Sequence, residues 1–426
     1  MSNENQTSEP RQSSTNRDVE KQTVPAPPTF PEGSLQGWLT VVGAWLVIFV
    51  SFGYTNAFGV FQAYYAGGYP EESAMNISWI GSIQLFLQYI LGALVGPLYE
   101  KGYFHHLMVS GSVLYIVCIF MTSLATRFWQ TILAQGIGIG IGIGGVYLPA
   151  LSVATHYFQH RRALALGIVV TGSSIGGICL PIMLNNLIAK HGFKLAVQYT
   201  GYLLMGCLIV ANCLMRTRLP PKHVSALKPS PKDMFSSVPY CFLVAGLFLC
   251  AWGIFFPFYY VQDLGNARGI SPNITFYSLA FMNAGSVFGR ITPNFLADNS
   301  GCLNLLTIMS TVAGIMSFAF FGATNAAGLI IVGILYGFFS GAFISLMAPA
   351  LISFARDFHE IGLRTGMGLL VMSFAVLTGT PITGALLDKY GFYAPITWSG
   401  VTILSGCVCF AISTVLRRRE KSTWKV

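Results

Sequence analysis

Long apolar stretches, separated by short polar connections, constrain the fold of this chain more than any other feature of its sequence. A helix of about 20 apolar residues is long enough to cross the hydrocarbon core of a bilayer. Six such stretches precede a polar segment and six follow it, near residues 38–61, 78–98, 107–125, 129–150, 163–184, 195–215, 239–261, 275–297, 304–323, 327–350, 365–387 and 395–416. The pattern predicts an all-α membrane protein with twelve transmembrane helices in two six-helix bundles.

The composition agrees with a chain surrounded by lipid. Of its 426 residues, 54% are hydrophobic and 9% are charged, whereas soluble domains contain about 25% charged residues. This charge content is too low to cover a water-exposed surface, which argues against a soluble enzyme. Most of the nine cysteines lie within or at the edge of apolar stretches, which argues against a disulfide framework.

The polar segments divide the chain into five regions. Residues 1–34 are rich in Pro and Ser and lack the apolar core of a signal peptide, which predicts a disordered tail. The other four regions are an N-terminal bundle (35–215), a central loop (216–238), a C-terminal bundle (239–416) and a short tail (417–426).

Lys and Arg are unevenly distributed over the connections. With the N-terminus in the cytoplasm, the inner connections and tails hold 18 of the 24 Lys and Arg residues, and the outer connections hold five. Because cytoplasmic loops are enriched in these residues, both tails and the central loop are predicted to be cytoplasmic. The sequons at Asn76 and Asn273 then lie outside, as candidate glycosylation sites. The topology accounts for the basic clusters, so nucleic-acid binding is not expected.

The two halves of the sequence repeat each other. Pro149-Ala150-Leu151 recurs as Pro349-Ala350-Leu351, and Pro181-Ile182 recurs as Pro381-Ile382, each 200 residues later. Because each half has an even number of spans, both halves begin on the same side of the membrane. Such a parallel repeat predicts a substrate site near the middle of the membrane, where the halves meet, and alternating access around that site.

Several motifs resemble a known family. They are residues 31–38 with Asn56 to Gln62, the run from His156 to Gly167 with Gly172 to Gly177, and Gly289-Arg290 with Leu296-Ala297-Asp298. Together they resemble the fungal branch of the monocarboxylate porter family, within the major facilitator superfamily. The resemblance covers about residues 31–416. It implies a secondary transporter but does not specify the substrate.

Two positions differ from the proton-coupled lactate carriers of that family. Those carriers have a Lys on the first helix, where this chain has Asn56. They also have an Asp one turn before the Arg of the eighth helix, where this chain has Ser286, although the Arg itself is retained as Arg290. Proton–lactate symport is therefore not expected.

Arg290 is the one charged residue that the sequence places well within a predicted span. Charged residues within the membrane usually face a cavity or a partner, and a guanidinium can hold a carboxylate through two parallel hydrogen bonds. The position alone does not separate this role from a structural one, and the family resemblance favours Arg290 as the anchor of a substrate carboxylate. The alternatives are that it snorkels to the membrane surface or pairs with Asp298 in a structural role.

Five other residues are expected near the substrate, by their polar or aromatic character and their predicted depth: Asn56, Gln135, Tyr259, Asn283 and Tyr336. For each of them taken alone, packing within the bundle or against lipid is the simpler interpretation. An aromatic cavity of this kind would suit a larger organic molecule better than lactate.

Charged residues in the inner connections are candidates for a gate. Glu100-Lys101 and Asp298 follow the second and eighth spans, where the superfamily has a gating loop, and Arg161 and Arg162 precede the fifth span. They are expected to form ion pairs that close the inner side. Ordinary loop charge is the alternative.

Glycines at a spacing of four mark the fourth span. Gly136, Gly140 and Gly144 form a face that allows another helix to approach closely. Gly172 and Gly176 of the fifth span are the expected partners.

The function that these features favour is secondary transport of a small organic solute that carries a carboxylate, in the direction of export of a fungal secondary metabolite. Uptake of a monocarboxylate or a vitamin-like nutrient is the alternative, and a non-transporting membrane sensor is a minor one. No cofactor, metal or catalytic residue is expected. The location expected is the plasma membrane, with the vacuole or another internal membrane as the alternative.

The mode of coupling stays open. The sequence places no Asp, Glu or His deep within a span, and proton relays in membranes are normally built from such groups. Transport is then facilitative, or protons travel with the substrate, or a carboxylate at the rim titrates.

Overall fold

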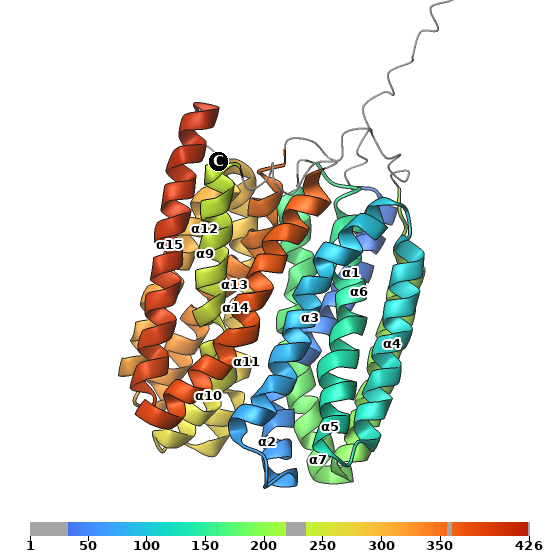
Figure 1. The fold of residues 1–426 in the computed structure, drawn as a ribbon, viewed down its shortest axis with the longest axis vertical. Helices are drawn as coiled ribbons and strands as arrows, with labels where there is room; N and C mark the ends of the chain where they lie inside the picture. The colour runs from blue at the N-terminus through green and yellow to red at the C-terminus, as the bar shows by residue number, and fades with distance from the viewer. Residues whose placement is uncertain (1–32, 160, 219–235, 356–359, 425–426) are drawn as a thin grey trace, which may run out of the picture.

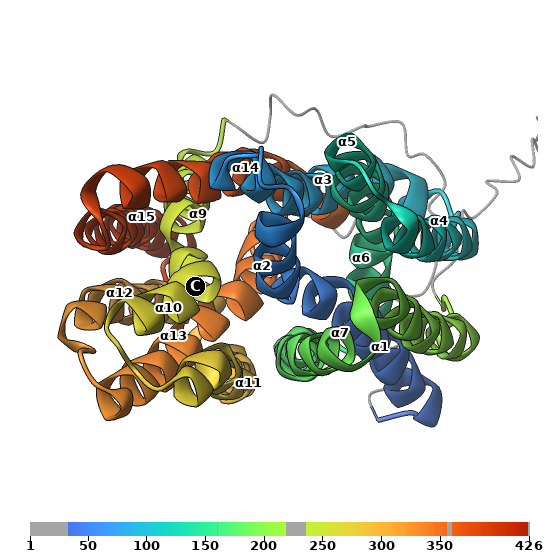
Figure 2. The ribbon, with the colours of Figure 1, turned by 90° about the horizontal axis from the view of Figure 1, so that it is seen from below.

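The computed structural model describes residues 33–159, 161–218, 236–355 and 360–424, and within these ranges every regular element is helical. The predicted tail at residues 1–34 and the central loop at 216–238 lie mostly outside the described residues. Figures 1 and 2 show long helices that run roughly parallel to one another in two groups. In Figure 2, α14 lies beside α3 and α11 lies beside α7, so these two pairs join the groups.

The first half begins with helices that are capped by serine. The Ser34 Oγ accepts a hydrogen bond from the Gly37 amide at 3.2 Å, and the Ser73 Oγ accepts one from the Asn76 amide at 3.1 Å, which satisfies amides that a helix start leaves unpaired. The elements are α1 (Leu35–Asn56), α2 (Phe58–Gly68), α3 (Ala74–Glu100), α4 (Phe104–Leu124), α5 (Phe128–Thr131), a π-helix η1 (Ile132–Ile139), α6 (Gly140–Ala154) and α7 (Arg162–Leu214).

The second half uses the same device at α13, where the Asn325 Oδ1 accepts a hydrogen bond from the Gly328 amide at 2.8 Å. The elements are α9 (Val238–Ile254), α10 (Phe256–Ala267), α11 (Pro272–Ser300), α12 (Cys302–Ala319), a short 3₁₀ helix η2 (Phe320–Gly322), α13 (Ala326–Ile352), α14 (Ile361–Tyr390) and α15 (Tyr393–Lys421).

Ten helical segments of the described chain are long and apolar enough to cross a membrane, against twelve spans predicted. Two features account for the difference. The 53 residues of α7 are interrupted at Gly192, where φ is 77°, and the more polar α11, which carries Asn283 and Arg290, falls outside the ten. A straight helix of that length would measure about 80 Å, far more than a bilayer.

The two halves have similar helix boundaries and similar Trp–Thr contacts. The Trp45 Nε1 donates to the Thr171 Oγ1 at 3.0 Å, and the Trp252 Nε1 donates to the Thr378 Oγ1 at 2.8 Å, so each bond joins residues 126 apart. Gly391 separates α14 from α15 with a φ of 67°, close to the value at Gly192. These two glycines, 199 residues apart, therefore mark equivalent helix boundaries in the two halves, whereas the two Trp–Thr bonds are 207 residues apart and do not join positions that the sequence repeat pairs.

The glycines of the fourth span pack against α3. The faces of Gly136, Gly140 and Gly144 lie against residues 80–91 of α3. The expected pairing with Gly172 and Gly176 is wrong, because these two glycines pack on Trp45, Phe49 and Gly53 of α1. Sequence spacing identifies a glycine face, but the rotation of each helix decides which neighbour it meets.

The outer faces of the helices are apolar. On α4, the side chains of Val109, Val113, Val117 and Met121 follow one another at a spacing of four and are each more than half exposed. Extended apolar rows of this kind are not tolerated on a water-exposed monomer. They identify the surface that lipid covers.

Candidate functional site

A cavity of about 250 Å³ lies between the two halves. Its walls come from α1, α3, α6 and α7 on one side and from Phe255, α10, α11, α13 and α14 on the other, and most of the lining is apolar or aromatic. The lining includes Ile48, Phe52, Asn56, Tyr89, Tyr147, Leu148, Leu151, Leu166, Val170, Ser173, Phe255, Phe258, Arg290, Ile344, Ser345, Met347 and Leu369. The position between two bundles is where transporters of this architecture hold their ligands.

One end of the cavity reaches the face of the molecule on which the C-terminus lies (Figure 1). There the lining residues are at helix ends: Glu100 at the end of α3, Arg162 at the start of α7, Thr217 beyond α7 and Gly362 in the first turn of α14. The structure therefore has its crevice open toward the side that carries the C-terminus.

The first helix of each half is broken at the level of the cavity. Ala57 separates α1 from α2, and Phe255 separates α9 from α10. Asn56 and Phe255, which flank or form these breaks, both line the cavity. The dihedral angles of Ala57 and Phe255 stay in the right-handed helical region, and the Ala57 amide still donates to the Gly53 carbonyl oxygen at 3.2 Å. Each break is therefore a local kink within one span.

Arg290 lies at the boundary between the halves. Its Nη1 donates to the Val170 carbonyl oxygen at 2.6 Å and also to the Ser173 Oγ, and its Nε donates to the Ser286 Oγ at 3.1 Å. The side chain lines the cavity and is 2% exposed, so it does not snorkel to the membrane surface. The side chain of Asp298, the alternative partner, lies outside what the structure describes.

The guanidinium of Arg290 retains donor capacity toward the cavity. Its hydrogen bonds to described residues use Nε and Nη1, which leaves Nη2 for a ligand. Tyr89 and Tyr147 line the opposite side of the cavity, from the first half, and are within electrostatic range of the guanidinium. The other charged lining residues in the described chain, Glu100 and Arg162, are at the mouth. The deep part of the cavity is thus an apolar, aromatic chamber with one cation.

Asn56 and Asn283 meet at Gly177. The Asn56 Nδ2 donates to the Ser173 carbonyl oxygen at 3.3 Å, and the Asn283 Nδ2 donates to the Gly177 carbonyl oxygen at 3.4 Å. Asn283 is fully buried, and its Oδ1 accepts no hydrogen bond within the described chain. The structure brings these two predicted residues together, one from each half.

Replacing Gly177 with alanine is expected to lower transport by about tenfold. A β-carbon at Gly177 would lie 2.9 Å from both the Asn56 Nδ2 and the Asn283 Oδ1, and overpacking of this kind costs about 1–3 kcal/mol. Initial rates of transport into vesicles would measure the effect. Gly145→Ala is the matched control, because its β-carbon would meet one atom, at 3.5 Å. Equal rates for the two variants would contradict a role for this contact.

The other three predicted residues have different surroundings. Gln135 is buried within the first half, where its Oε1 accepts a hydrogen bond from the Tyr65 hydroxyl. Tyr336 is buried within the second half, where its hydroxyl donates to the Ile254 carbonyl oxygen at 2.7 Å. Tyr259 lines a separate space of about 10 Å³, which is room for about one water molecule. None of the three is on the main cavity wall.

The predicted gate residues divide into two groups. Glu100 and Arg162 line the mouth of the cavity, and the Glu100 carboxylate lies directly over Gly362 of α14, where it leaves no room for a β-carbon. Lys101 and Arg161 are exposed. Glu100 thus contacts the opposite half at the start of α14, a contact that sequence spacing alone did not predict.

The sequons lie at helix starts on the face opposite to the cavity mouth. Asn76 is in the first turn of α3, with its Nδ2 donating to the Glu72 Oε2 at 2.8 Å, and Asn273 is in the first turn of α11. Both side chains are exposed.

Two further residues were not predicted from the sequence: one at the cavity mouth and one at the start of α14. His156 lines the cavity, and its Nε2 lies 2.8 Å from the Tyr99 hydroxyl. Arg364 was assigned to a connection, but it lies in the first turn of α14, 2% exposed, with its Nε 2.7 Å from the Glu360 carboxylate and its guanidinium over the Tyr240 ring. Their positions at the ends of apolar stretches were the available sign of burial.

Comparisons with known proteins identify the family. The sequence profile of the Major Facilitator Superfamily matches residues 40–293, more than half of the chain. The chain is 39% identical over 390 residues to the aspyridones efflux protein apdF of Emericella nidulans, with 91% of this chain and 79% of the relative covered. It is 37% identical over 374 residues to the agnestins efflux protein AgnL12 of Paecilomyces divaricatus, with 87% and 85% covered.

A solved structure has the same fold. The crystal structure of the human organic anion transporter MFSD10 superposes with a TM-score of 0.70 over 87% of this chain and 98% of that one, at 13% sequence identity. At that identity the likeness concerns the fold alone. From the profile match and the relatives, the chain belongs to the Major Facilitator Superfamily of membrane transporters.

Proposed function

We propose that this protein exports an organic anion, a carboxylate-bearing secondary metabolite, by alternating access of the cavity between its two halves. The observation that carries the proposal is Arg290, a buried cation on the wall of an otherwise apolar and aromatic chamber. Such a chamber favours a ligand with a hydrophobic body and one anionic group. The names of relatives such as the aspyridones and agnestins efflux proteins support export as the direction.

The topology that we propose has twelve crossings. The positive φ at Gly192, matched by Gly391 between α14 and α15, supports two crossings within α7, and α11 supplies a further one. The distribution of Lys and Arg supports cytoplasmic termini and therefore a cavity that faces the cytoplasm, with the plasma membrane as the location. Limited proteolysis or cysteine labelling of tails in sealed cells would test the orientation, and labelling of either tail from outside would overturn it.

The experiment that tests the function is transport in inside-out plasma-membrane vesicles from cells that express the protein. A panel of apolar aromatic carboxylic acids and their methyl esters would be assayed by mass spectrometry, with and without a pH gradient. We expect uptake of acids in preference to esters, and a dependence on the gradient would identify proton coupling. Transport confined to right-side-out vesicles would instead favour uptake of a monocarboxylate or a vitamin-like nutrient.

Within the superfamily, we place the chain in the monocarboxylate porter family, on the motifs around helices α1, α7 and α11. Ser286 occupies the position of the Asp of the proton-coupled carriers, and its Oγ is 3.1 Å from the Arg290 Nε. This arrangement leaves Arg290 without an acidic neighbour on its own helix one turn away.

Ser286→Asp is therefore expected to lower the affinity for an anion at neutral pH by at least about tenfold. The introduced carboxylate would bind the Arg290 guanidinium in place of the substrate. The apparent Km for the preferred acid measures the effect. Ser286→Asn, which is similar in size but neutral, should stay within about threefold of the wild type. An unchanged Km in the Asp variant would argue that the anion binds elsewhere.

A further inference from the structure

The last helix carries a continuous row of lipid-facing residues that ends in a basic turn. Val408, Ile412 and Val415 of α15 are 60%, 36% and 48% exposed. Their spacing of four and three residues places them on one face of the helix. Arg418 and Arg419, both exposed, follow Val415 by three and four residues and so continue the same face.

The length of α15 places this turn at the level of lipid headgroups. Its 29 residues extend over about 43 Å, whereas the hydrocarbon core of a bilayer is about 30 Å thick. Arg419 lies about 6 Å along the helix axis beyond Val415. A lipid whose acyl chain covers Val415 therefore has its phosphate close to Arg418 and Arg419.

The turn has an excess of positive charge that its own acidic residue does not cancel. Glu420 accepts a hydrogen bond from the Arg417 Nη1 at 3.0 Å. Arg418 donates through its Nη2 to the Asn304 Oδ1 at 3.0 Å. Arg418, Arg419 and Lys421 are all exposed.

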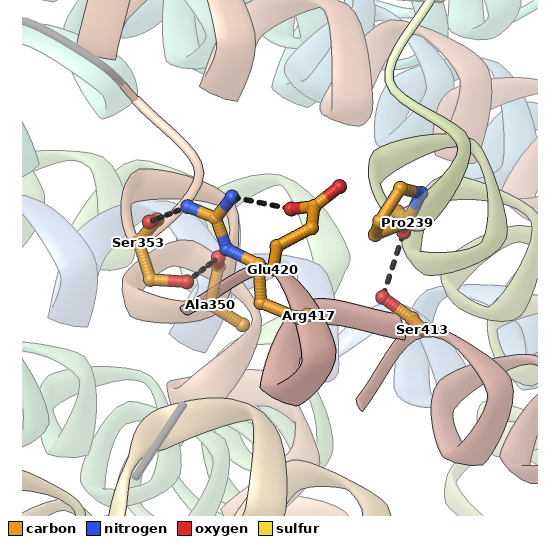
Figure 3. Close-up of polar contacts among 6 residues, drawn as sticks. All are labelled: Pro239, Ala350, Ser353, Ser413, Arg417 and Glu420. Carbon is orange, nitrogen blue, oxygen red and sulfur yellow. Dashed lines mark hydrogen bonds and ion pairs between the residues drawn. The ribbon is translucent and has the colours of Figure 1, made fainter. Parts of the chain in front are cut away.

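Arg417 has a different role, which Figure 3 shows. It turns inward, where its Nη2 donates to the Ser353 carbonyl oxygen at 3.2 Å and its guanidinium lies 4.6 Å from the centre of the Phe354 ring. One turn earlier, the Ser413 Oγ donates to the Pro239 carbonyl oxygen at 2.7 Å. These contacts attach the end of α15 to α9 and to the end of α13, so the turn that carries the outward cations is anchored to the bundle.

We propose that Arg418, Arg419 and Lys421 form a binding site for the headgroup of an anionic phospholipid, of the phosphatidylserine type. Guanidinium groups bind phosphate through paired, charge-assisted hydrogen bonds, and the acyl chains lie along Val408, Ile412 and Val415. Trp424, which is 65% exposed, adds an aromatic ring near the headgroups, as is typical of membrane interfaces. A lipid is the occupant because the cations continue the row that lipid already covers.

The test uses the full-length protein in phosphatidylcholine nanodiscs, with a fluorescent phosphatidylserine that reports affinity. In a second measurement, native mass spectrometry counts the lipid that stays bound after exchange into detergent. We expect wild type to retain phosphatidylserine in preference to phosphatidylcholine, and the affinity to fall with added salt. Loss of one exposed cation near an anionic surface should weaken binding about fivefold, and loss of two about 25-fold. The variants are Arg419→Gln, which leaves the Asn304 bond in place, and Arg418→Gln/Arg419→Gln.

Lys190→Gln/Lys194→Gln is the matched control, since both lysines are exposed on the opposite face. Unchanged retention in Arg419→Gln and the double variant, or an equal loss in the control, would overturn the proposal. So would glycerophosphoserine, the headgroup without acyl chains, competing as strongly as the lipid, because the site would then be one for free phosphate esters. The assay has no transport step, so its result is independent of the proposed export function.

Discussion

Arg290→Ala is expected to abolish the preference for a carboxylic acid over its methyl ester. The guanidinium is the cation on the deep wall of the cavity, and a charge-assisted hydrogen bond from its Nη2 to a carboxylate contributes about 1.5–3 kcal/mol, or roughly 10- to 100-fold in affinity. The measurement is the ratio of transport efficiencies for an acid and its ester in inside-out vesicles. Arg290→Lys keeps the charge but cannot make the Ser286 and Val170 hydrogen bonds and present a further donor to the ligand at the same time, so it should lose about tenfold.

The ester comparison separates the two roles of Arg290. Because the side chain also donates to Val170 and Ser173 of α7, the alanine variant loses a contact between the halves. A purely structural loss would lower transport of the acid and the ester together. Such a parallel decrease, with the ratio unchanged, would remove the anchor role.

Gly337→Ala is expected to have the largest effect on folding. The helices α11 and α13 approach each other through four glycines, Gly285 and Gly289 on α11 and Gly337 and Gly341 on α13. A β-carbon at Gly337 would overlap the carbonyl oxygen of Met282, which is backbone and cannot rotate away. Overpacking costs about 1–3 kcal/mol where side chains can adjust, so we expect the free energy of unfolding to fall by about 3 kcal/mol or more here. The variant should then give little or no monodisperse protein on gel filtration.

Thermal unfolding in detergent and yield from gel filtration measure this effect. Gly206→Ala in α7 is the control, since no atom lies within 4 Å of its β-carbon position; it should change stability by less than about 1 kcal/mol. If enough Gly337→Ala protein folds to be assayed, its Km for the substrate should be raised, because α11 also carries Arg290. A Gly337→Ala variant with wild-type unfolding temperature would contradict the close approach of α11 and α13.

Some of the fold was predictable because it depends on local sequence. The apolar stretches predicted the helices to within a few residues at most ends, since a chain in lipid must satisfy its backbone hydrogen bonds within each helix. The break at Gly192 was expected as a boundary between two spans, and φ there is positive. The breaks at Ala57 and Phe255 were not expected, although Pro257 follows Phe255 by two residues and removes a backbone donor from that turn.

The candidate site was predictable in part. Arg290 and Asn56 line the cavity, and both stood out in the sequence as a charge and a polar side chain within apolar spans. Gln135 and Tyr336 had the same appearance, yet their hydrogen-bonding partners are within their own halves. His156 had been assigned to a helix end, but its ring faces the cavity beside Tyr99.

Sequence by itself therefore determined that the chain is helical and belongs in lipid, and it revealed two related halves and the one strongly polar position in the eighth span. These properties follow from hydropathy and from residue offsets, which act along the chain. Tertiary structure decided which glycine faces meet, where the crevice opens and which polar side chains line it. The physical reason is that these depend on the rotation of each helix about its axis, and that rotation is set by packing between residues far apart in the sequence.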